Sequence, residues 1–316
     1  MDVQFANELK AWGPQAASRT LSVAEAEAYC RALACTHYEN FPLVSWMLPR
    51  RLQQHFYNVY AYCRWADNLG DEVQDAGQAI ELLAWWRAQL GDCYRGSASH
   101  PVFIALGPTI ERFAIPPQPF EDLLSAFEQD QRVREYDSFD ELREYCRRSA
   151  DPVGRLVLYL CGCFSERNAG WSDSICTGLQ LANFWQDVAR DFDIGRVYIP
   201  RDTRRRFGYS DRDLHDRLTN GPFVELMRFE VERARQFLHD GLPLVEVLPW
   251  RLQIDVDLFA RGGLRILDRI EKIGYRVWQT RPVVTKFDFA RLFFGSLGRG
   301  LVRRLHRRRV LPAGLP

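Results

Sequence analysis

The sequence predicts an all-α protein folded as a single domain. Three observations favour this class: helix-period patterns and caps recur along the chain, strand-like alternation is nearly absent, and no repeat or low-complexity linker divides it. The 316 residues are 47% hydrophobic, enough for a large buried core. Length alone favours about two domains of ~150 residues, so the prediction of one domain depends on the missing linker.

Capping residues and prolines predict where the helices begin. Ser22 with Glu25, and Ser138 with Glu141, have the spacing of a capping box. Prolines at first-turn positions open the helices predicted from residues 101 and 152. The predicted helices cover residues 22–35, 51–67, 79–90, 101 onward, 138 onward, 152–164, 171–192, 223–239 and 250–274, with a break expected at 168–170.

The sequence lacks the motifs of several nucleotide-binding and metal-binding sites. GxGxxG and GxxxxGK[ST] are absent, which argues against a Rossmann or P-loop nucleotide site. HExxH and paired cysteines are absent, and none of the six histidines follows a glutamate by three residues, so zinc and carboxylate-bridged di-iron sites are not expected. A formal net charge of +1 argues against nucleic acid as a partner of the whole protein.

The cysteines and the N-terminal segment indicate a cytoplasmic protein. The eight cysteines are scattered without paired spacing, which predicts free buried thiols in a reducing compartment. We expect no signal peptide, because no basic stretch precedes an apolar one at the N-terminus. The sequence contains no run of ~18 apolar residues, so we expect no membrane-spanning helix.

Two aspartates stand out in the segment FYNVYAYCRWADNLGDE. On a helical wheel with Leu52 at zero, Phe56 and Cys63 lie at about 40° and 20°, and Asp67 and Asp71 lie at about 60° and 100°. We therefore expect both carboxylates to continue the apolar stripe that faces the core. Like charges one turn apart in such a place require a proton or a cation.

A second polar stripe lies in CTGLQLANFWQDVARDFD. Gln180, Asn183, Asp187 and Asp191 recur at helical spacing within about 80° of one another. The remaining positions are mostly apolar, and a helix that is apolar nearly all round is buried. The stripe is therefore expected to line an internal cavity.

Together the two segments predict a magnesium site. Two such helices facing each other would offer four carboxylates and an amide, and hard oxygen ligands suit Mg²⁺. The cation would bind an anionic leaving group, with Arg64 nearby as a fixed charge. A single DxxxD is more often a solvated helix face, so the prediction depends on finding two, each in an aromatic, apolar helix.

YAYCRWADNLGDE and QLANFWQDVARDFDIGRVYIP resemble the two aspartate signatures of the squalene/phytoene synthase family of all-α prenyltransferases. The similarity extends over residues 22–287. Further segments resemble the hydroxysqualene synthase branch of the bacterial squalene and hopanoid pathway: HYENFP, FEQDQRVREYDSFDEL, YCRRSADPVGRLVL and TRPVVTKFD.

The resemblance implies a helical bundle of the isoprenoid synthase type with a central cavity, and a Mg²⁺-dependent enzyme acting on prenyl diphosphates. The implied metal ligands are Asp67, Asp71, Asn183, Asp187 and Asp191. The implied diphosphate contacts are Tyr60, Arg64, Gln180 and Arg281, and Tyr145 would face the reacting carbons. The implied reaction converts presqualene diphosphate and water to hydroxysqualene and diphosphate.

Some positions depart from the family pattern and leave alternatives open. Asn68 stands where many members have aspartate, and Arg190 replaces a common acidic residue. His37 and Asn40 are candidates for positioning water, with a purely structural role as the alternative. The competing functions are a head-to-head synthase that makes presqualene diphosphate, squalene or phytoene, and a non-catalytic relative that serves as an assembly or lipid-binding module.

The C-terminal segment carries a separate signal. Phe289, Phe293 and three leucines recur every four residues, and seven arginines lie between Arg291 and Arg309. A basic amphipathic helix is typical of attachment to a membrane surface, here the inner face. The alternatives are a helix packed on the body or a nucleic-acid patch. The predicted organisation is thus an N-terminal extension (1–21), a catalytic domain (22–287) and a basic tail (288–316).

Overall fold

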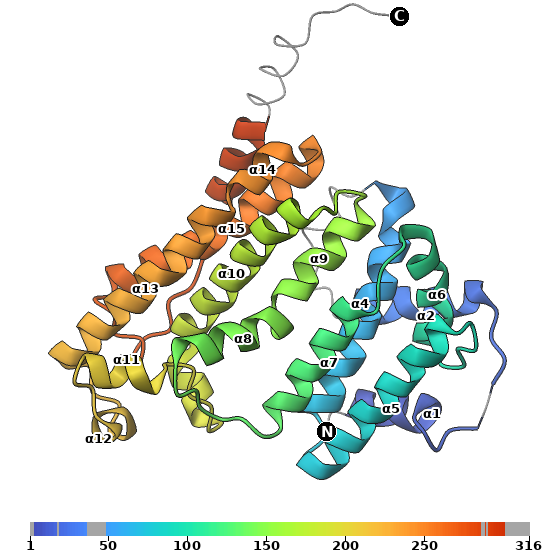
Figure 1. The fold of residues 1–316 in the computed structure, drawn as a ribbon, viewed down its shortest axis with the longest axis horizontal. Helices are drawn as coiled ribbons and strands as arrows, with labels where there is room; N and C mark the ends of the chain where they lie inside the picture. Colours follow the sequence, from blue (N-terminus) through green and yellow to red (C-terminus); the bar gives the residue numbers. More distant parts are fainter. Residues whose placement is uncertain (1–2, 18, 37–48, 286–287, 289, 301–316) are drawn as a thin grey trace, which may run out of the picture. The chain divides into compact units, whose positions relative to one another are not determined.

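The computed structural model describes residues 3–17, 19–36, 49–285, 288 and 290–300, and within these ranges the regular elements are all helices (Figure 1). The one strand-like feature among these residues is an isolated bridge between Glu135 and Val197. The prediction of an all-α protein is confirmed. No helix in the described ranges is long and apolar enough to cross a membrane.

The chain divides into two compact units. Unit 1 comprises Met1–Val133 and Arg147–Ala169, and unit 2 comprises Arg134–Cys146 and Gly170–Pro316. The helices of unit 1 are α1 (Val3–Trp12), α2 (Val23–Thr36), α4 (Arg50–Asp71), α5 (Ala76–Tyr94), α6 (Pro101–Phe113), α7 (Gln118–Asp130) and α9 (Asp151–Leu160). Those lying wholly or mostly in unit 2 are α8 (Phe139–Ser149), α10 (Glu166–Asp193), α11 (Arg201–Arg206), α12 (Asp211–His215), α13 (Gly221–Gly241), α14 (Pro243–Val247) and α15 (Trp250–Lys272). The domain limits expected at residues 22 and 287 stay a prediction.

Helix α4 is the centre of unit 1 and contacts α2, α5, α6, α7 and α9. Its buried Trp65 stacks on Trp86 with ring centroids 5.2 Å apart, and the Tyr62 hydroxyl donates to the Phe120 carbonyl. His100 caps α6, lies edge-on to both tryptophans, and has its pKa lowered to about 3 by burial. This core is therefore aromatic and holds a neutral imidazole, and it fixes the direction of α4.

Glycines let the long helices of unit 2 approach closely. A Cβ atom at Gly178 of α10 would lie 2.7 Å from Cγ of Leu238 on α13. A Cβ atom at Gly263 of α15 would lie 2.8 Å from Cδ2 of Leu179 on α10. Because alanine would clash at both points, these glycines fix α10, and with it the polar stripe, against α13 and α15.

The predicted capping box is complete at Ser22 and half formed at Ser138. The Ser22 backbone N–H donates to the Glu25 carboxylate and the Glu25 N–H donates to the Ser22 hydroxyl, at 2.8 and 3.3 Å. At the start of α8 the Glu141 N–H donates to the Ser138 hydroxyl, but the Glu141 carboxylate accepts from Asp137 instead of Ser138. Local side-chain chemistry thus fixed both helix starts.

The predicted break at residues 168–170 is wrong. Helix α10 begins at Glu166, because the Ser165 hydroxyl accepts the N–H of Asn168 and caps the helix before the Asn-Ala-Gly sequence. The short helices α11, α12 and α14 and the N-terminal α1 were not predicted, since a helix of five to ten residues has too little periodicity to detect.

Asp255 on α15 is a buried carboxyl group that no hydrogen bond from a described residue stabilises. It is 3% exposed, and neither of its carboxyl oxygens has a hydrogen-bond partner in the part of the chain that the structure describes. Burial raises its pKa to about 7. The group is therefore protonated in the folded protein at pH values where an ordinary aspartate is charged.

We expect Asp255→Asn to stabilise the protein at high pH. The unfolded chain releases this proton near pH 4 and the folded protein near pH 7, so wild-type stability falls across that interval and levels off above it. The free energy of unfolding of the variant should exceed that of the wild type by about 2–4 kcal/mol at pH 8 and by much less at pH 4. Chemical denaturation across this range tests the prediction. Asp240→Asn, at an exposed carboxyl, is the matched control, and equal pH profiles for all three proteins would contradict it.

Candidate active site

The predicted site residues of unit 1 share one side of α4. Tyr60, Arg64, Asp67 and Asp71 follow one another at helical spacing, each half-buried or exposed. The Asp67 side chain is 39% exposed and the Arg64 side chain is 25% exposed. The structure therefore places these groups on a continuous polar stripe of the helix.

The expectation that Asp67 and Asp71 continue the core-facing stripe is wrong. The buried side of α4 is centred near Tyr62, about 140° from Asp67 and about 180° from Asp71 on the helical wheel. The wheel was anchored on Leu52, which is itself only half-buried and lies at the margin of the core face. The two carboxylates instead line the accessible side of the helix.

Charge pairing organises the stripe on α4. Nη1 of Arg64 donates to Oδ2 of Asp67 at 2.9 Å, one turn along the helix. Burial raises the pKa of Tyr60, with the Arg64 charge opposing and the Asp67 charge adding to the effect. A phenol, a guanidinium and a carboxylate thus act on one another within two turns, so the implied anion-binding and cation-binding groups are adjacent.

The second stripe lies on α10 in unit 2. Gln180 and Asp191 are half-buried, Asn183 is exposed, and the Asp187 side chain is 13% exposed. The flanking side chains are buried: Leu181, Ala182, Phe184, Trp185, Gln186 and Val188. The polar stripe is thus the accessible side of an otherwise buried helix, as the sequence predicted for its apolar surroundings.

Asp187 is held by an arginine from a distant part of the sequence. Nε and Nη2 of Arg281 donate to Oδ1 and Oδ2 of Asp187 at 2.5 and 3.0 Å. Arg190 adds a weaker contact, with its Nε 3.8 Å from Oδ1. The resemblance implies separate roles for Asp187 and Arg281, toward metal and diphosphate, whereas the structure brings the two together as a bidentate pair.

Two contacts fix the segment that carries Arg281, and sequence reasoning missed both. Nε2 of Gln186 donates to the Pro282 carbonyl at 2.5 Å, and the Trp278 ring packs edge-on against Phe192 on α10. Gln186 lies within the quoted second signature, but periodicity places it on the buried side and gives no sign of a partner 96 residues away. Only the tertiary structure reveals this anchor.

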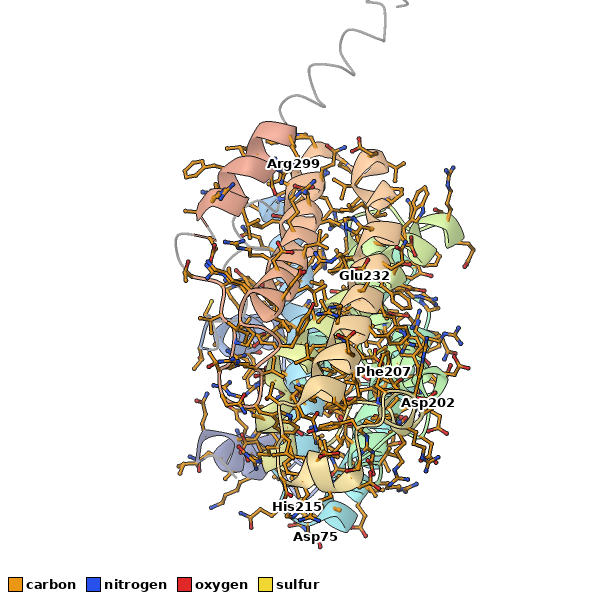
Figure 2. All side chains as sticks on the ribbon, turned by 90° about the vertical axis from the view of Figure 1, so that its left-hand side faces the viewer. Asp75, Asp202, Phe207, His215, Glu232 and Arg299 are labelled. Carbon is orange, nitrogen blue, oxygen red and sulfur yellow. The ribbon has the colours of Figure 1, made fainter. Side chains whose placement is uncertain are left out.

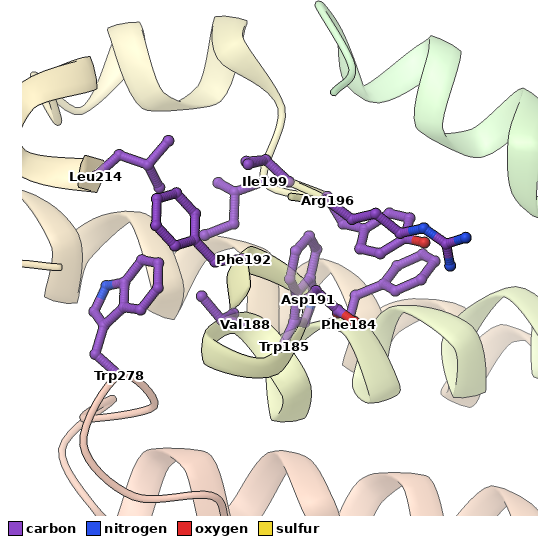
Figure 3. Close-up of a pocket in the computed structure, with 11 residues that line it drawn as sticks. Phe184, Trp185, Val188, Asp191, Phe192, Arg196, Ile199, Leu214 and Trp278 are labelled. Atoms are coloured by element: carbon purple, nitrogen blue, oxygen red, sulfur yellow. The ribbon is translucent and has the colours of Figure 1, made fainter. Parts of the chain in front are cut away.

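Asp191 lies beside a small apolar pocket. Figure 3 shows it with the rings of Phe184, Phe192 and Trp278, which line the same pocket. The pocket encloses about 10 Å³. Burial and then the charge of Asp187 raise the pKa of Asp191 to about 7, while Arg196 acts in the opposite direction. This space holds at most one water molecule, so it cannot accept a substrate, and its effect is to desolvate the carboxyl group.

Tyr145 belongs to an aromatic cluster on the same unit. Its ring centroid lies 5.6 Å from that of Tyr136, 6.1 Å from Tyr198 and 6.3 Å from Phe184. Tyr198 stacks on Phe184 at 3.7 Å, and Phe184 follows Asn183 directly in the stripe. The cluster therefore presents aromatic side chains next to the implied ligands of α10.

The donor set is chemically suited to a hard cation, although the described residues contain no cluster of three His, Cys, Asp or Glu side chains that could hold a metal. Unit 1 supplies Asp67 and Asp71, and unit 2 supplies Asn183, Asp187 and Asp191. All five offer carboxylate or amide oxygens, which Mg²⁺ prefers. Their convergence on one ion stays a prediction.

The two candidate water-positioning residues cannot be placed. His37 and Asn40 lie outside the described residues, so their role stays a prediction as well.

The all-α fold and its two aspartate-bearing helices define a synthase of the isoprenoid type. The chain belongs to the squalene/phytoene synthase family, whose members process prenyl diphosphates: its residues 34–288 match the family model.

Individual relatives differ in their reactions. A phytoene synthase of Arthrospira platensis is 30% identical, over 81% of this chain and 87% of its own. A hydroxysqualene synthase of Rhodopseudomonas palustris is 32% identical, over 84% of this chain and 90% of its own. The crystal structure of squalene synthase HpnC from Alicyclobacillus acidocaldarius is 40% identical, with a TM-score of 0.78 over 80% of this chain and 95% of its own. The comparisons thus establish the family and leave more than one reaction open.

We expect Arg281→Gln to strengthen binding of a divalent cation while weakening binding of a diphosphate. Without Arg281 the Asp187 carboxylate loses its bidentate partner, and a bond of this kind is worth about five- to tenfold in affinity. Titration with Mn²⁺ in the absence of substrate, followed by electron paramagnetic resonance, measures the first effect, and calorimetry with inorganic diphosphate measures the second. Arg190→Gln is the control, because its longer contact should change both values less. Weaker Mn²⁺ binding in Arg281→Gln would show that the pair does not compete with the cation.

Proposed function

We propose that the protein catalyses the Mg²⁺-dependent conversion of presqualene diphosphate and water to hydroxysqualene and diphosphate, as a step of bacterial squalene and hopanoid biosynthesis. The observation that carries the proposal is the second signature on α10, where Asp187 and Asp191 stand beside a guanidinium and an aromatic cluster. Similarity to hydroxysqualene synthases of two bacteria, each at 32% identity, supports the choice of reaction.

The leaving group is the first requirement of this chemistry. The C–O bond breaks heterolytically, its electron pair departs with diphosphate, and bound Mg²⁺ would supply charge neutralisation for that departure. Arg64 lies on the stripe of α4, Arg281 contacts the stripe of α10 from the segment after α15, and each is already hydrogen-bonded to an aspartate. We infer that they exchange these carboxylates for diphosphate oxygens when substrate binds, because guanidinium suits both anions.

The carbocation is the second requirement. The cyclopropylcarbinyl cation rearranges and is then captured by water, whose proton passes to solvent. Tyr136, Tyr145, Phe184 and Tyr198 can stabilise positive charge with their π-faces and contain no basic group that would react with it. The aromatic cluster is therefore assigned to the reacting carbons.

The alternative is a head-to-head condensation of two prenyl diphosphates. Phytoene synthases at 30% identity are as similar to the chain as the hydroxysqualene synthases are. This reaction also begins with loss of diphosphate, so it requires the same signatures.

A product assay separates the two reactions. With presqualene diphosphate and Mg²⁺ alone, we expect mass spectrometry to detect a hydroxylated C30 alcohol and no hydrocarbon. Farnesyl diphosphate and geranylgeranyl diphosphate, each supplied alone, should stay unconverted. Formation of presqualene diphosphate or phytoene from these substrates would support the alternative, and a requirement for NADPH would indicate a squalene synthase.

Binding of Mn²⁺ tests whether the two signatures share their metal ions. Asp67→Asn and Asp187→Asn should each abolish turnover and each lower Mn²⁺ affinity by about tenfold or more, and the double variant should lose less than the product of the two effects. Independent sites would instead give multiplicative losses. Asp193→Asn is the matched control, since this carboxylate lies on α10 but pairs with Arg217 away from the stripe. All variants should keep the wild-type circular dichroism spectrum, and full activity in both single variants would place the site elsewhere.

A further inference from the structure

Unit 2 contains a large basic groove distant in sequence from both signatures. It lies between α13, α15 and the helix formed by residues 290–300, and its volume is about 490 Å³. Figure 2 labels Arg299 on that last helix and Glu232 on α13. The groove is lined by the basic residues Arg235, His239, Arg261, Arg265, Arg291 and Arg299, with Leu264 and Leu292 between them.

Two buried carboxylates organise these arginines. Asp257 is fully buried and accepts from Nε of Arg261 at 3.0 Å and from Nη2 of Arg299 at 2.6 Å. Asp288 is 3% exposed and accepts from Arg265 at 2.6 Å and from Arg269 at 2.5 Å. Five arginines and two aspartates, Asp268 and Asp288, line the groove, so its wall has more positive than negative charges.

Several guanidinium donors remain available to a ligand. Among the residues that the structure describes, Arg261 donates only from Nε to Asp257 and leaves both of its Nη atoms, and Arg265 leaves its Nη1. Arg235 is paired with three carboxylates, which together leave that end of the groove negative, so the positive charge of the groove lies at Arg261, Arg265 and Arg291. Arg291 is exposed and makes no ion pair with another described residue. The chemistry of the groove thus favours a group with several anionic oxygens, such as a phosphate.

An apolar side chain accompanies the charges. Phe294, one turn after Arg291 on the same helix, is 68% exposed, the most exposed of the large aromatic side chains in the described ranges. An exposed ring beside arginines suits a surface where headgroup phosphates and acyl chains meet. A free phosphate gives no role to this ring.

We propose that this groove binds the headgroups of anionic phospholipids and docks the protein on a bilayer surface, with Phe294 inserted among the acyl chains. Arg261, Arg265 and Arg291 contact the phosphate oxygens. The proposal does not depend on which reaction the active site catalyses. A surface docked in this way would nevertheless place a prenyl product close to lipid.

Vesicle co-sedimentation of the full chain without substrate tests the proposal. Wild-type protein should bind vesicles of phosphatidylcholine with added phosphatidylglycerol, should not bind phosphatidylcholine alone, and should dissociate at high salt. Arg291→Glu should lower partitioning by about twentyfold to thirtyfold, since it removes one attracting charge and adds one repelling charge. Phe294→Ser should lower it by about fivefold to tenfold.

The controls separate this groove from general electrostatics. Arg212→Glu makes the same charge change at an exposed position on α12 and should alter partitioning less than about threefold. Equal losses in Arg212→Glu and Arg291→Glu would overturn the proposal, as would unchanged binding in Arg291→Glu, because the basic residues after 300 would then suffice. Binding of inorganic phosphate without any binding of vesicles would also overturn it. Circular dichroism and turnover of a detergent-dispersed substrate verify that each variant is folded.

Discussion

A carboxylate inside an apolar helical protein must be paired, protonated or bound to a cation, and unit 2 is organised by that constraint. Asp257 and Asp288 are paired, each with two arginines, and these pairs fasten the C-terminal helix to α15. Burial would raise the pKa of Asp257, but hydrogen bonds from Arg299 and Ser296 and the nearby guanidinium charges lower it overall. Asp255 has no such partner among the described residues, and burial raises its pKa to about 7. Removing one member of a buried pair costs more than the pair contributes, so these arginines are part of the scaffold.

The carboxylates of the stripe on α10 are under the same constraint, but they lie on the accessible side of the helix. Asp187 is paired with Arg281, while Asp191, one turn away, is half-buried beside Asp187 and has a raised pKa. Asp187 is therefore held by a guanidinium, and Asp191 keeps its proton to a higher pH than an ordinary aspartate does. A divalent cation would relieve both conditions at once, since it replaces the arginine at the first and the proton at the second. The sequence already indicated this need, because it placed the carboxylates among apolar residues.

The starts of several helices could be predicted from the sequence, whereas the face that a helix buries against its neighbours could not. Hydroxyl caps and first-turn prolines gave the starts of α2, α6 and α9, since each depends on residues within one turn. The face of α4 was predicted wrongly, because an apolar residue at one helix end does not reveal where neighbouring helices contact it. Gln186 and Arg281 required the fold itself, as their partners are more than 90 residues away. The candidate site residues could thus be proposed from type and spacing, whereas their pairing could not.

Solvent exposure distinguishes the arginine–aspartate ion pairs that a ligand can reach from those that only stabilise the fold. Asp257 is fully buried, so a ligand cannot reach it without unfolding the helix packed over it. Asp187 is 13% exposed and Arg281 is 35% exposed, so solvent and ions reach this pair directly. Its bond is correspondingly weakened by screening, and exchange of the carboxylate for a diphosphate costs little. An arginine is the appropriate residue for such an exchange, because its planar fork matches carboxylate and phosphate oxygens equally well and keeps its charge throughout. On the proposed mechanism, Arg281 would hold Asp187 in place until substrate binds and would then be available to the leaving group.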